Sequence, residues 1–280
     1  MATNPNAIDR YGVIGYPISH SRSPVIHKLF AYQTNQNMRY ELLQVAPDKL
    51  ETMVRQFQRT GGKGLNVTVP HKVEVTKLTD QMSERAAEAG AVNTLVFQDD
   101  EVFGDNTDGI GLVRDLVANQ GLNLKDAAIL ILGAGGATRG IVGPLLDLEP
   151  ERLVIANRTE KKAEIIADHF ARHGPVESCS FDAIDDSVDW QLVINATSAG
   201  YKGEELPFPA SVVSGDPLCY DLSYGLKLTP FCSWAREQGA GRVAMGWGML
   251  VEQAAESFHL WRGVRPDTAP VLKQIVVSAS

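Results

Sequence analysis

The sequence predicts a mixed α/β protein built from two lobes. Short β-branched runs alternate with helical patterns along its 280 residues, and this alternation is typical of sheets covered by helices. A chain of this length holds one large domain or two ordinary ones. A turn at Asn106–Asp108 leads into a helix, so we expect two α/β series joined at that point.

The first series occupies the first third of the chain. Its expected strands are Tyr11–Gly15, Arg39–Leu43, Lys63–Val67 and Ala91–Phe97. Its expected helices are Pro24–Thr34, Pro47–Thr60, His71–Leu78 and Ser83–Ala89. Proline begins two of these helices, where its fixed φ suits the first turn. Glu101–Phe103 is expected to pair with the preceding strand as a hairpin.

The second series begins with an expected helix at Asp108–Asn119. Its expected strands are Ala127–Leu132, Arg152–Ala156, Leu192–Asn195, Leu218–Asp221 and Arg242–Ala244. Its further helices are expected at Thr159–His173, Thr229–Gln238, Gly248–Arg262 and Thr268–Val277. Between the first two strands, Gly140, Gly143 and Pro144 predict a short or bent helix.

Composition and charge exclude several classes of protein. Apolar residues make up 44% and charged residues 21%, which is close to globular averages and argues against intrinsic disorder. Lys and Arg number 26 against 34 Asp and Glu, a net charge of −8. This acidic balance argues against sequence-independent binding to nucleic acid or to an anionic membrane. An acidic substrate would therefore be captured by local groups.

Cysteine usage and apolar runs bear on metal content and location. Cys179, Cys219 and Cys232 have no paired short spacing, which fits neither a disulfide framework nor a zinc site, and we expect no metal. The segment Met1–Arg10 is polar, and Ala127–Leu132 is too short an apolar run to span a bilayer. We expect a soluble, cytoplasmic protein.

A glycine-rich turn, Gly133-Ala-Gly-Gly-Ala137, directly follows the apolar run Ala127–Leu132. A buried strand, such a turn and a helix start form the context that the dinucleotide fingerprint requires. Gly133 permits the tight turn, and Gly135 lets the backbone approach a pyrophosphate at the helix N-terminus. Thr138 stands where the fingerprint expects its third Gly or Ala. The alternative is a βα turn that needs glycine for sterics alone. We expect a Rossmann-like domain here.

The end of the next strand bears on the choice of dinucleotide. NAD enzymes usually place a carboxylate there for the ribose hydroxyls, whereas this chain has Asn157-Arg-Thr159 followed by Lys161 and Lys162. A guanidinium, a hydroxyl and an ammonium suit the 2′-phosphate of NADP. Alternatively, Thr159 caps the helix and the basic side chains are simply solvated. Glu160 keeps NAD open as a less favoured cofactor.

Two serines mark the start of the first expected helix. Ser23 is expected as the N-cap and Pro24 as the first helical residue. The hydroxyls of Ser21 and Ser23 can both point along the helix start, where the dipole favours an anion, and could hold a small carboxylate. An ordinary serine-capped helix is the alternative.

Further polar residues follow other strands of the first series. Thr68 can donate a hydrogen bond, and Lys72, expected at the start of a helix, can donate and accept a proton at a strand's carboxyl end. A solvated surface lysine is the alternative. Asn93 and Asp108 stand in glycine-flanked clusters that are otherwise turns or caps.

Several motifs occur together in one order. They are Ser21-Arg-Ser23-Pro24, Asn66-Val-Thr-Val-Pro-x-Lys72, Ala89-Gly-Ala-Val-Asn93-Thr94, Asp105-Asn-Thr-Asp108-Gly109, Gly133-Ala-Gly-Gly-Ala137, Asn157-Arg-Thr159, Asn195-Ala-Thr-Ser198 and Gly246-x-Gly-Met-Leu-Val-x-Gln253. With these motifs the chain resembles the shikimate dehydrogenase family over nearly its whole length. The resemblance implies reversible reduction of 3-dehydroshikimate to shikimate, usually with NADPH, in aromatic amino-acid biosynthesis. It also implies a substrate-binding and catalytic domain of residues 1–107, joined by C-terminal helices at about 248–280, and a dinucleotide-binding domain of residues 108–247.

The resemblance further implies roles for individual residues. Ser21 and Ser23 would hold the substrate carboxylate, with Tyr224 close to it, and Lys72 and Asp108 match the family's catalytic pair. The ring hydroxyls would be surrounded by Thr68, Lys72, Asn93, Asp108 and Gln253. The cofactor site would comprise Gly133, Ala134, Gly135, Gly136 and Ala137 at the pyrophosphate, Asn157, Arg158, Thr159 and Lys162 at the 2′-phosphate side, and Thr197, Leu222 and Gly246, the last lining the nicotinamide pocket.

Some features keep alternatives open. His71 stands where many relatives carry an apolar aromatic residue and could affect Lys72 or the pocket, although His20, His27 and His71 show no metal spacing and are expected to be structural or peripheral. A quinate or quinate/shikimate dehydrogenase using NAD is the second interpretation, although serine at both 21 and 23 suits shikimate. A nucleotide- or metabolite-sensing relative is the third, and the retention of Lys72 and Asp108 argues against it. A monomer or a homodimer fits the sequence.

Overall fold

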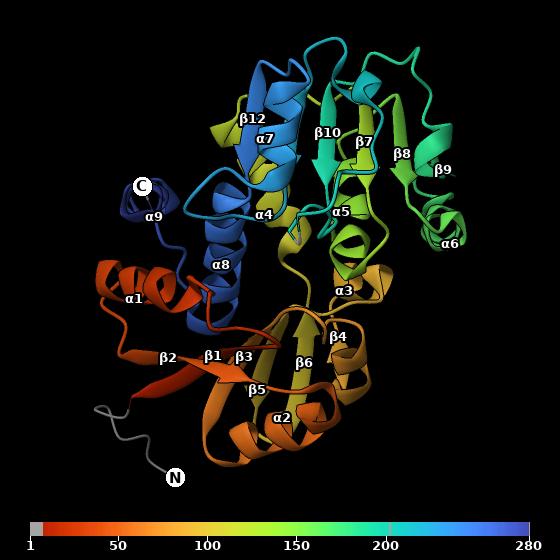
Figure 1. The fold of residues 1–280 in the computed structure, drawn as a ribbon. Coiled ribbons are helices and arrows are strands. Elements are labelled where there is room, and N and C mark those ends of the chain that lie inside the picture. The colour runs from red at the N-terminus through yellow and green to blue at the C-terminus, as the bar shows by residue number, and fades with distance from the viewer. Residues whose placement is uncertain (1–7, 202, 280) are drawn as a thin grey trace. The chain divides into compact units, whose positions relative to one another are not determined.

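The computed structural model describes residues 8–201 and 203–279. The chain divides into two compact units, which Figure 1 shows with their elements labelled. The first unit comprises Met1–Gly111 and Leu250–Ile275, and the second comprises Leu112–Met249 and Val276–Ser280. Residues 1–7, which make up most of the polar segment expected at the N-terminus, lie outside the described residues.

The first unit is built on a mixed sheet. Its strands are β1 (Asp9–Gly15), β2 (Met38–Gln44), β3 (Gly62–Val67), β4 (Gln81–Met82), β5 (Thr94–Gln98) and β6 (Glu101–Asp105). They lie in the order β2-β1-β3-β5-β6-β4. Strand β1 is parallel to β2 and β3, and β5 is antiparallel to β3 and β6. The pairing of β5 with β6 confirms the expected hairpin.

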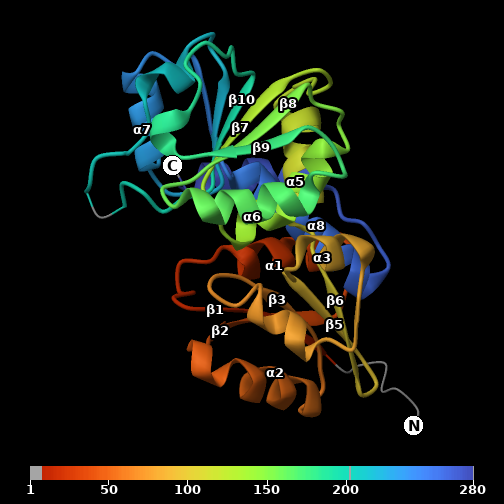
Figure 2. The same cartoon turned by 90° about the vertical axis from the view of Figure 1, so that its right-hand side faces the viewer.

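Helices cover both faces of this first sheet. Its helices are α1 (Ser23–Gln33), α2 (Leu50–Arg59), α3 (Glu84–Ala89), α8 (Trp247–Arg262) and α9 (Thr268–Ala279). Figure 2 shows α2 and α1 on opposite sides of the strands. Leu65 and Val67 of β3 pack in one core with residues of α2. Because side chains alternate along a strand, Asn66 points the other way, where it bonds to Ser257 of α8.

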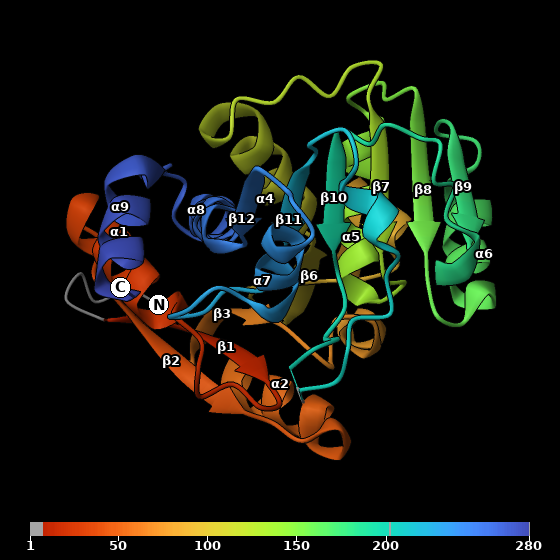
Figure 3. The same cartoon turned by 45° about the horizontal axis from the view of Figure 1, so that its top comes forward.

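The second unit is built on a parallel sheet. Its strands are β7 (Ala128–Leu132), β8 (Arg152–Ala156), β9 (Val176–Cys179), β10 (Leu192–Asn195), β11 (Leu218–Asp221) and β12 (Arg242–Met245). They lie in the order β12-β11-β10-β7-β8-β9, seen side by side in Figure 3. This is the doubly wound order, and its direction reverses between β7 and β10. The expected Rossmann-like fold is therefore confirmed.

Two apolar cores enclose the second sheet. The helices of this unit are α5 (Gly136–Leu146), α6 (Glu160–Phe170) and α7 (Pro230–Glu237), and α4 (Asp108–Arg114) leads into it. Ile129 and Ile131 of β7 belong to the core under α5 and α6, whereas Leu130 and Leu132 belong to the core under α7. Burial of both faces explains the continuous apolar run in this strand.

Several expected elements differ in detail from the structure. The helix expected over His71–Leu78 is a turn followed by a 3₁₀ segment, Glu74–Leu78, so Lys72 lies in a turn and does not begin a helix. The Thr76 hydroxyl bonds to the Val73 carbonyl at 2.7 Å, and such bonds compete with a regular helix. The helix expected to Asn119 is α-helical only to Arg114 and continues as a π-helical turn over Asp115–Asn119, called the π-turn below.

The strand expected from Ala91 begins at Thr94. Val92 bonds outside the ladder, because its N–H donates to the Lys72 carbonyl at 2.8 Å. Strands β4 and β9 carried no alternating signal and were not expected. Within the described ranges, no helix is long and apolar enough to cross a membrane, and no group of three or more His, Cys, Asp or Glu side chains is arranged to hold a metal.

Candidate functional site

Ser21 and Ser23 lie together at the start of α1. The helix begins at Ser23, with Arg22 at the N-cap position, so the expectation that Ser23 is the N-cap is wrong. Ser21 Oγ accepts the N–H of Ser23 at 3.3 Å and bonds the Ser23 hydroxyl at 3.2 Å. The two hydroxyls therefore face one point at a helix N-terminus, where backbone partial charge favours an anion.

Lys72 and Asp108 form an ion pair with little exposure to solvent. Lys72 Nζ donates to Asp108 Oδ2, and the side chains are 13% and 6% exposed. Asp108 is the first residue of α4, but its carboxylate faces Lys72 and Asn93 and not the helix end. Neither the solvated-lysine nor the helix-cap alternative describes this pair. An ammonium held against a carboxylate in a partly dry site is placed for proton transfer.

Asn93 joins this ion pair to α8. Its amide nitrogen donates to Asp108 Oδ1 at 2.8 Å, and its amide oxygen accepts the backbone N–H of Thr107 at 2.8 Å. The same nitrogen lies 3.5 Å from Gln253 Oε1. Lys72, Asp108, Asn93 and Gln253, which are far apart in sequence, thus form one hydrogen-bonded group within the first unit.

Thr68 and His71 lie in the turn that carries Lys72. Thr68 is partly buried directly after β3, and its N–H donates to the Ile14 carbonyl at 2.9 Å. His71 is buried, and its Nε2 lies 2.7 Å from the Val45 carbonyl oxygen. The histidine ring is therefore engaged with backbone, as expected for a structural residue.

The cofactor-side residues follow the carboxyl ends of the parallel strands. Gly133 has φ +112°, and a Cβ there would lie 2.8 Å from Thr197 Cγ2, so a tight turn with close packing requires glycine. Thr138 is buried and donates its hydroxyl to the Gly133 carbonyl at 2.8 Å. The threonine that departs from the fingerprint therefore braces the glycine turn.

The positions after β8, β10, β11 and β12 lie at the same edge. Arg158, Thr159 and Lys162 are exposed, and Thr159 occupies the N-cap position of α6 without a side-chain capping bond. Asn157 donates its amide to the Thr159 carbonyl at 2.8 Å. A Cβ at Gly246 would lie 2.4 Å from the Leu222 carbonyl oxygen, so these two strand ends approach closely.

Tyr224 belongs to the second unit, where its ring packs on Trp247 with centroids 4.6 Å apart.

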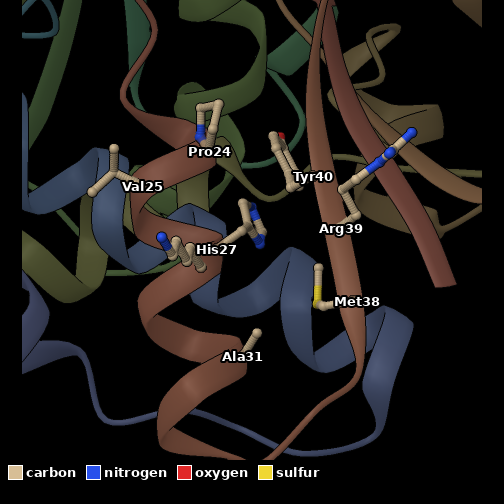
Figure 4. A pocket seen from close by; sticks show the side chains of 8 residues that line it. Pro24, Val25, His27, Ala31, Met38, Arg39 and Tyr40 are labelled. Atoms are coloured by element: carbon tan, nitrogen blue, oxygen red, sulfur yellow. The ribbon is translucent and has the colours of Figure 1, made fainter. Parts of the chain in front are cut away.

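A separate pocket of 370 Å³ lies in the first unit between α1 and β2 (Figure 4). It is lined by Pro24, Val25, His27, Lys28, Ala31, Met38, Arg39 and Tyr40. None of the residues predicted for substrate binding belongs to this lining.

Four buried polar side chains around Asn93 were not predicted as site residues from the sequence. Asn66, Thr94, Thr107 and Ser257 are all buried and hydrogen-bonded to one another or to Asn93. Asn66, Thr94 and Thr107 stand inside the quoted motifs, so their neighbours in the sequence were a usable signal. Ser257 lies one helical turn beyond Gln253, and helical spacing would have placed both on one face.

Comparisons with known proteins identify relatives of this chain. Residues 13–95 match the model of the shikimate dehydrogenase substrate binding domain, residues 115–202 that of shikimate / quinate 5-dehydrogenase, and residues 246–276 that of the shikimate 5′-dehydrogenase C-terminal domain. The shikimate dehydrogenase (NADP(+)) of Nitrosospira multiformis is 52% identical over 264 residues, covering 94% of this chain and 96% of that protein. The one of Methylococcus capsulatus is 54% identical over 268 residues, covering 95% and 96%.

Solved structures share the same fold. An Ael1 enzyme from Pseudomonas putida has a TM-score of 0.89 and 46% identity, covering 97% of this chain and 100% of that one. The shikimate 5-dehydrogenase of Thermus thermophilus in complex with NADP(H) and shikimate has a TM-score of 0.86 and 29% identity, covering 98% and 100%. That of Listeria monocytogenes in complex with shikimate and NAD scores 0.83 at 26% identity, covering 98% and 99%. On these matches and its two-unit fold, the chain belongs to the shikimate dehydrogenase family.

Proposed function

We propose that this chain catalyses the reversible, NADP-dependent reduction of 3-dehydroshikimate to shikimate, a step of aromatic amino-acid biosynthesis. The observation that carries the proposal is the partly buried Lys72–Asp108 ion pair, whose carboxylate also accepts a hydrogen bond from Asn93. Relatives at about half identity over nearly the full chain are named NADP(+) shikimate dehydrogenases, which supports this choice of reaction.

The proton step falls to Lys72 and Asp108. When bound, NADPH supplies the hydride for the carbonyl carbon. Lys72 gives a proton from its ammonium to the carbonyl oxygen, and in the oxidation direction it takes that proton back from the hydroxyl. Asp108 accepts a hydrogen bond from Lys72 Nζ and so holds the ammonium in one orientation.

Substrate recognition uses the remaining polar side chains of the first unit. Ser21 and Ser23 would donate their hydroxyls to the substrate carboxylate at the start of α1. Thr68, Asn93 and Gln253 would bond the ring hydroxyls from the side of Lys72. Capture by hydroxyls and backbone dipoles fits a chain of net charge −8, whose overall field does not attract an acid. The resemblance also assigns Tyr224, a residue of the second unit, to the substrate carboxylate.

The second unit fits NADP. No heavy atom lies within 4 Å of the position that a Cβ would take at Gly135, so the turn has room for a pyrophosphate. The N-cap residue of α5 is Gly135, which has no side chain to cap the helix, so the first N–H groups of α5 can meet a phosphate. Arg158, Thr159 and Lys162 offer donors for a 2′-phosphate. Gly133 to Ala137, Asn157, Thr197, Leu222 and Gly246 would complete the site at the strand ends.

These assignments give each unit one ligand. The first unit, with the returning segment Leu250–Ile275, would bind substrate and carry the proton step. The second unit would bind the dinucleotide. The roles divide the chain at the α4 connection.

A quinate- or NAD-using enzyme is the second candidate, favoured by Glu160. This exposed acid is the first residue of α6, beside Arg158 and Thr159, where a carboxylate can meet ribose hydroxyls. The relative from Listeria monocytogenes was solved with NAD and shikimate.

A four-way steady-state comparison tests the proposal. Shikimate and quinate are each oxidised with NADP⁺ and with NAD⁺, and the reduced nicotinamide is followed by its absorbance. We expect kcat/KM to be highest for shikimate with NADP⁺. Dominance of quinate or NAD⁺ would reassign the substrate or cofactor, and turnover of none of the four pairs would overturn the proposed reaction.

A further inference from the structure

A continuous series of buried hydrogen bonds leads from Tyr40 to Asp108 within the first unit. The Tyr40 hydroxyl donates to Asn66 Oδ1 at 2.7 Å, and Asn66 Nδ2 donates to Ser257 Oγ at 2.9 Å. The hydroxyls of Ser257 and Thr94 lie 2.8 Å apart. Thr94 donates to Asn93 Oδ1 at 2.9 Å, and Asn93 Nδ2 donates to Asp108 Oδ1 at 2.8 Å. We call these bonds the Asp108 chain.

The bonds at the two ends of the Asp108 chain have directions fixed by their chemical groups. Asn66 Nδ2 can only donate and Asn93 Oδ1 can only accept. Each of the two hydroxyls between them has one proton. Thr94 gives its proton to Asn93. The Ser257 hydroxyl lies 2.8 Å from the Thr94 hydroxyl and 3.1 Å from the Gln253 carbonyl oxygen, and its single proton serves one of these two acceptors at a time. Both hydroxyls accept from Asn66 Nδ2, at 2.9 Å for Ser257 and 3.1 Å for Thr94.

The orientation of the Asn93 amide is fixed by two donors. Its oxygen accepts the Thr107 N–H at 2.8 Å and the Thr94 hydroxyl at 2.9 Å. Its nitrogen is therefore turned to Asp108 Oδ1, which leaves Oδ2 for Lys72.

We propose that Thr94 and Ser257 are positioning residues for the reaction, whose hydroxyls hold Asn93 and thereby fix the Asp108 carboxylate against Lys72. This proposal rests on the proposed function. Thr94 bonds Asn93 directly and Ser257 bonds Thr94, so both hydroxyls act on Asp108 through Asn93. Ser257 also bonds the Gln253 carbonyl at 3.1 Å, so the same hydroxyl ties the Gln253 turn of α8 to β5.

The outer end of the Asp108 chain is held by aromatic packing. The ring of Tyr40 stacks on His27 with centroids 4.2 Å apart and an interplanar angle of 9°. Figure 4 shows these two side chains between α1 and β2. Packing of this kind restricts the position of the Tyr40 phenol. The core, and not the substrate, therefore orients the first donor of the Asp108 chain.

Replacement of Thr94 separates its hydroxyl from its bulk. Thr94→Val keeps the volume and β-branching and removes the hydroxyl, whereas Thr94→Ser keeps the hydroxyl and removes a methyl group. We expect Thr94→Val to lower kcat for shikimate oxidation by roughly tenfold, equivalent to about 1.4 kcal/mol of transition-state stabilisation, with KM changed by less than about threefold. Thr94→Ser should recover most of that kcat even where its melting temperature is lower.

Ser257→Ala is tested beside Ala255→Gly, a control on the same helix. Ala255 is buried in α8 and lies outside the Asp108 chain, and glycine there weakens the helix. If Ser257→Ala lowered kcat only by destabilising the fold, Ala255→Gly would lower kcat by as much when its melting temperature falls equally. We expect the loss of kcat in Ser257→Ala alone.

The outcomes distinguish this proposal from the proposed function. Absence of turnover in the wild-type protein would overturn the proposed function. If the wild type is active, an unchanged kcat in Thr94→Val would overturn the positioning role. An equal loss of kcat in Thr94→Val and Thr94→Ser would overturn it as well. An equal loss in Ser257→Ala and Ala255→Gly would overturn it for Ser257.

Discussion

Lys72 and Asp108 show how neighbours decide the role of a titratable side chain. A lysine in a turn is ordinarily solvated, but this one is held by a carboxylate that a second residue orients. Removing either partner leaves the other charged and largely buried, which is costly. The pair is therefore expected to matter for stability as well as for the reaction.

Lys72→Ala removes the proposed proton donor. We expect kcat for shikimate oxidation to fall by about 10²-fold to 10⁴-fold, the usual contribution of a positioned acid or base. Affinity for NADPH, measured by fluorescence titration, should stay within about threefold because the cofactor residues lie in the second unit. Near-wild-type turnover in this variant would refute the catalytic assignment.

His27 makes stability depend on pH. Burial lowers the pKa of His27 from 6.5 to about 3. Between these values the unfolded chain binds a proton that the folded protein does not, so the free energy of unfolding decreases as pH falls, by about 1.4 kcal/mol per pH unit. Above pH 6.5 this residue adds no pH dependence.

His27→Phe retains a ring to stack on Tyr40 and removes the titrating group. In His27→Phe, the free energy of unfolding measured by urea titration should fall less between pH 6.5 and pH 5 than it does in the wild type, by about 2 kcal/mol. The same loss in both proteins would mean that another group carries the pH dependence.

At the scale of elements, the strands were predictable and their ends less so. Buried parallel strands such as β7 are apolar throughout, because both faces are covered, and they were located within a residue or two. Strand β9, Val-Glu-Ser-Cys, is a short edge strand with mixed polarity and gave no periodic signal. The 3₁₀ segment Glu74–Leu78 depends on side-chain bonds to backbone that no periodicity reveals.

The residues of the candidate site were likewise predictable only in part. Ser21, Lys72, Asn93 and Asp108 were identified because their motifs and resemblance mark them. Ser257 was missed, since its importance comes from β3 and β5 packing against α8, and that contact links residues far apart in sequence.

The turn between β8 and α6 is expected to select the dinucleotide. Arg158→Ala should weaken NADPH by roughly 10-fold to 100-fold, because a charge-assisted bond contributes about 1.5–3 kcal/mol, and should change NADH by much less. Lys161→Ala is the matched control, since Lys161 pairs with Glu164 at 2.9 Å. An equal loss of affinity for both dinucleotides would show that this turn does not bind the 2′-phosphate.

The π-turn after α4 packs tightly on the first turn of α8. A Cβ at Gly248 would lie 1.9 Å from Asp115 Oδ1, and Asp115 Oδ2 accepts the Tyr220 hydroxyl at 2.6 Å. Burial raises the pKa of Tyr220 well above its usual range, so the phenol remains a donor.

Gly248→Ala should force the Asp115 carboxylate away from Tyr220. We expect the free energy of unfolding to fall by about 2–4 kcal/mol, from overpacking together with a lost buried bond. Gly225→Ala, where the nearest heavy atom lies 3.3 Å from the new Cβ, is the control in a urea titration. A Gly248→Ala variant as stable as Gly225→Ala would contradict this packing.

At the scale of the whole molecule, the two α/β series were readable from the sequence because strand and helix periods alternate in each. Strand order was not readable. It follows from which strands share cores, as in the reversal between β7 and β10, and those contacts are set in three dimensions. The glycine-rich turn marked the first strand of the second sheet, since phosphate-binding turns follow that strand in doubly wound folds.

The first unit is interrupted in sequence, since it includes Leu250–Ile275 after the whole of the second unit. A ribosome makes the chain from its N-terminus, and domains generally fold as units during synthesis. The second unit has its sheet complete at Met245, whereas β3 and β5 still lack Ser257 and Trp261 at that moment. The later-encoded unit can therefore finish folding first, and the nascent N-terminal sheet must wait for its α8 contacts until the last helices emerge.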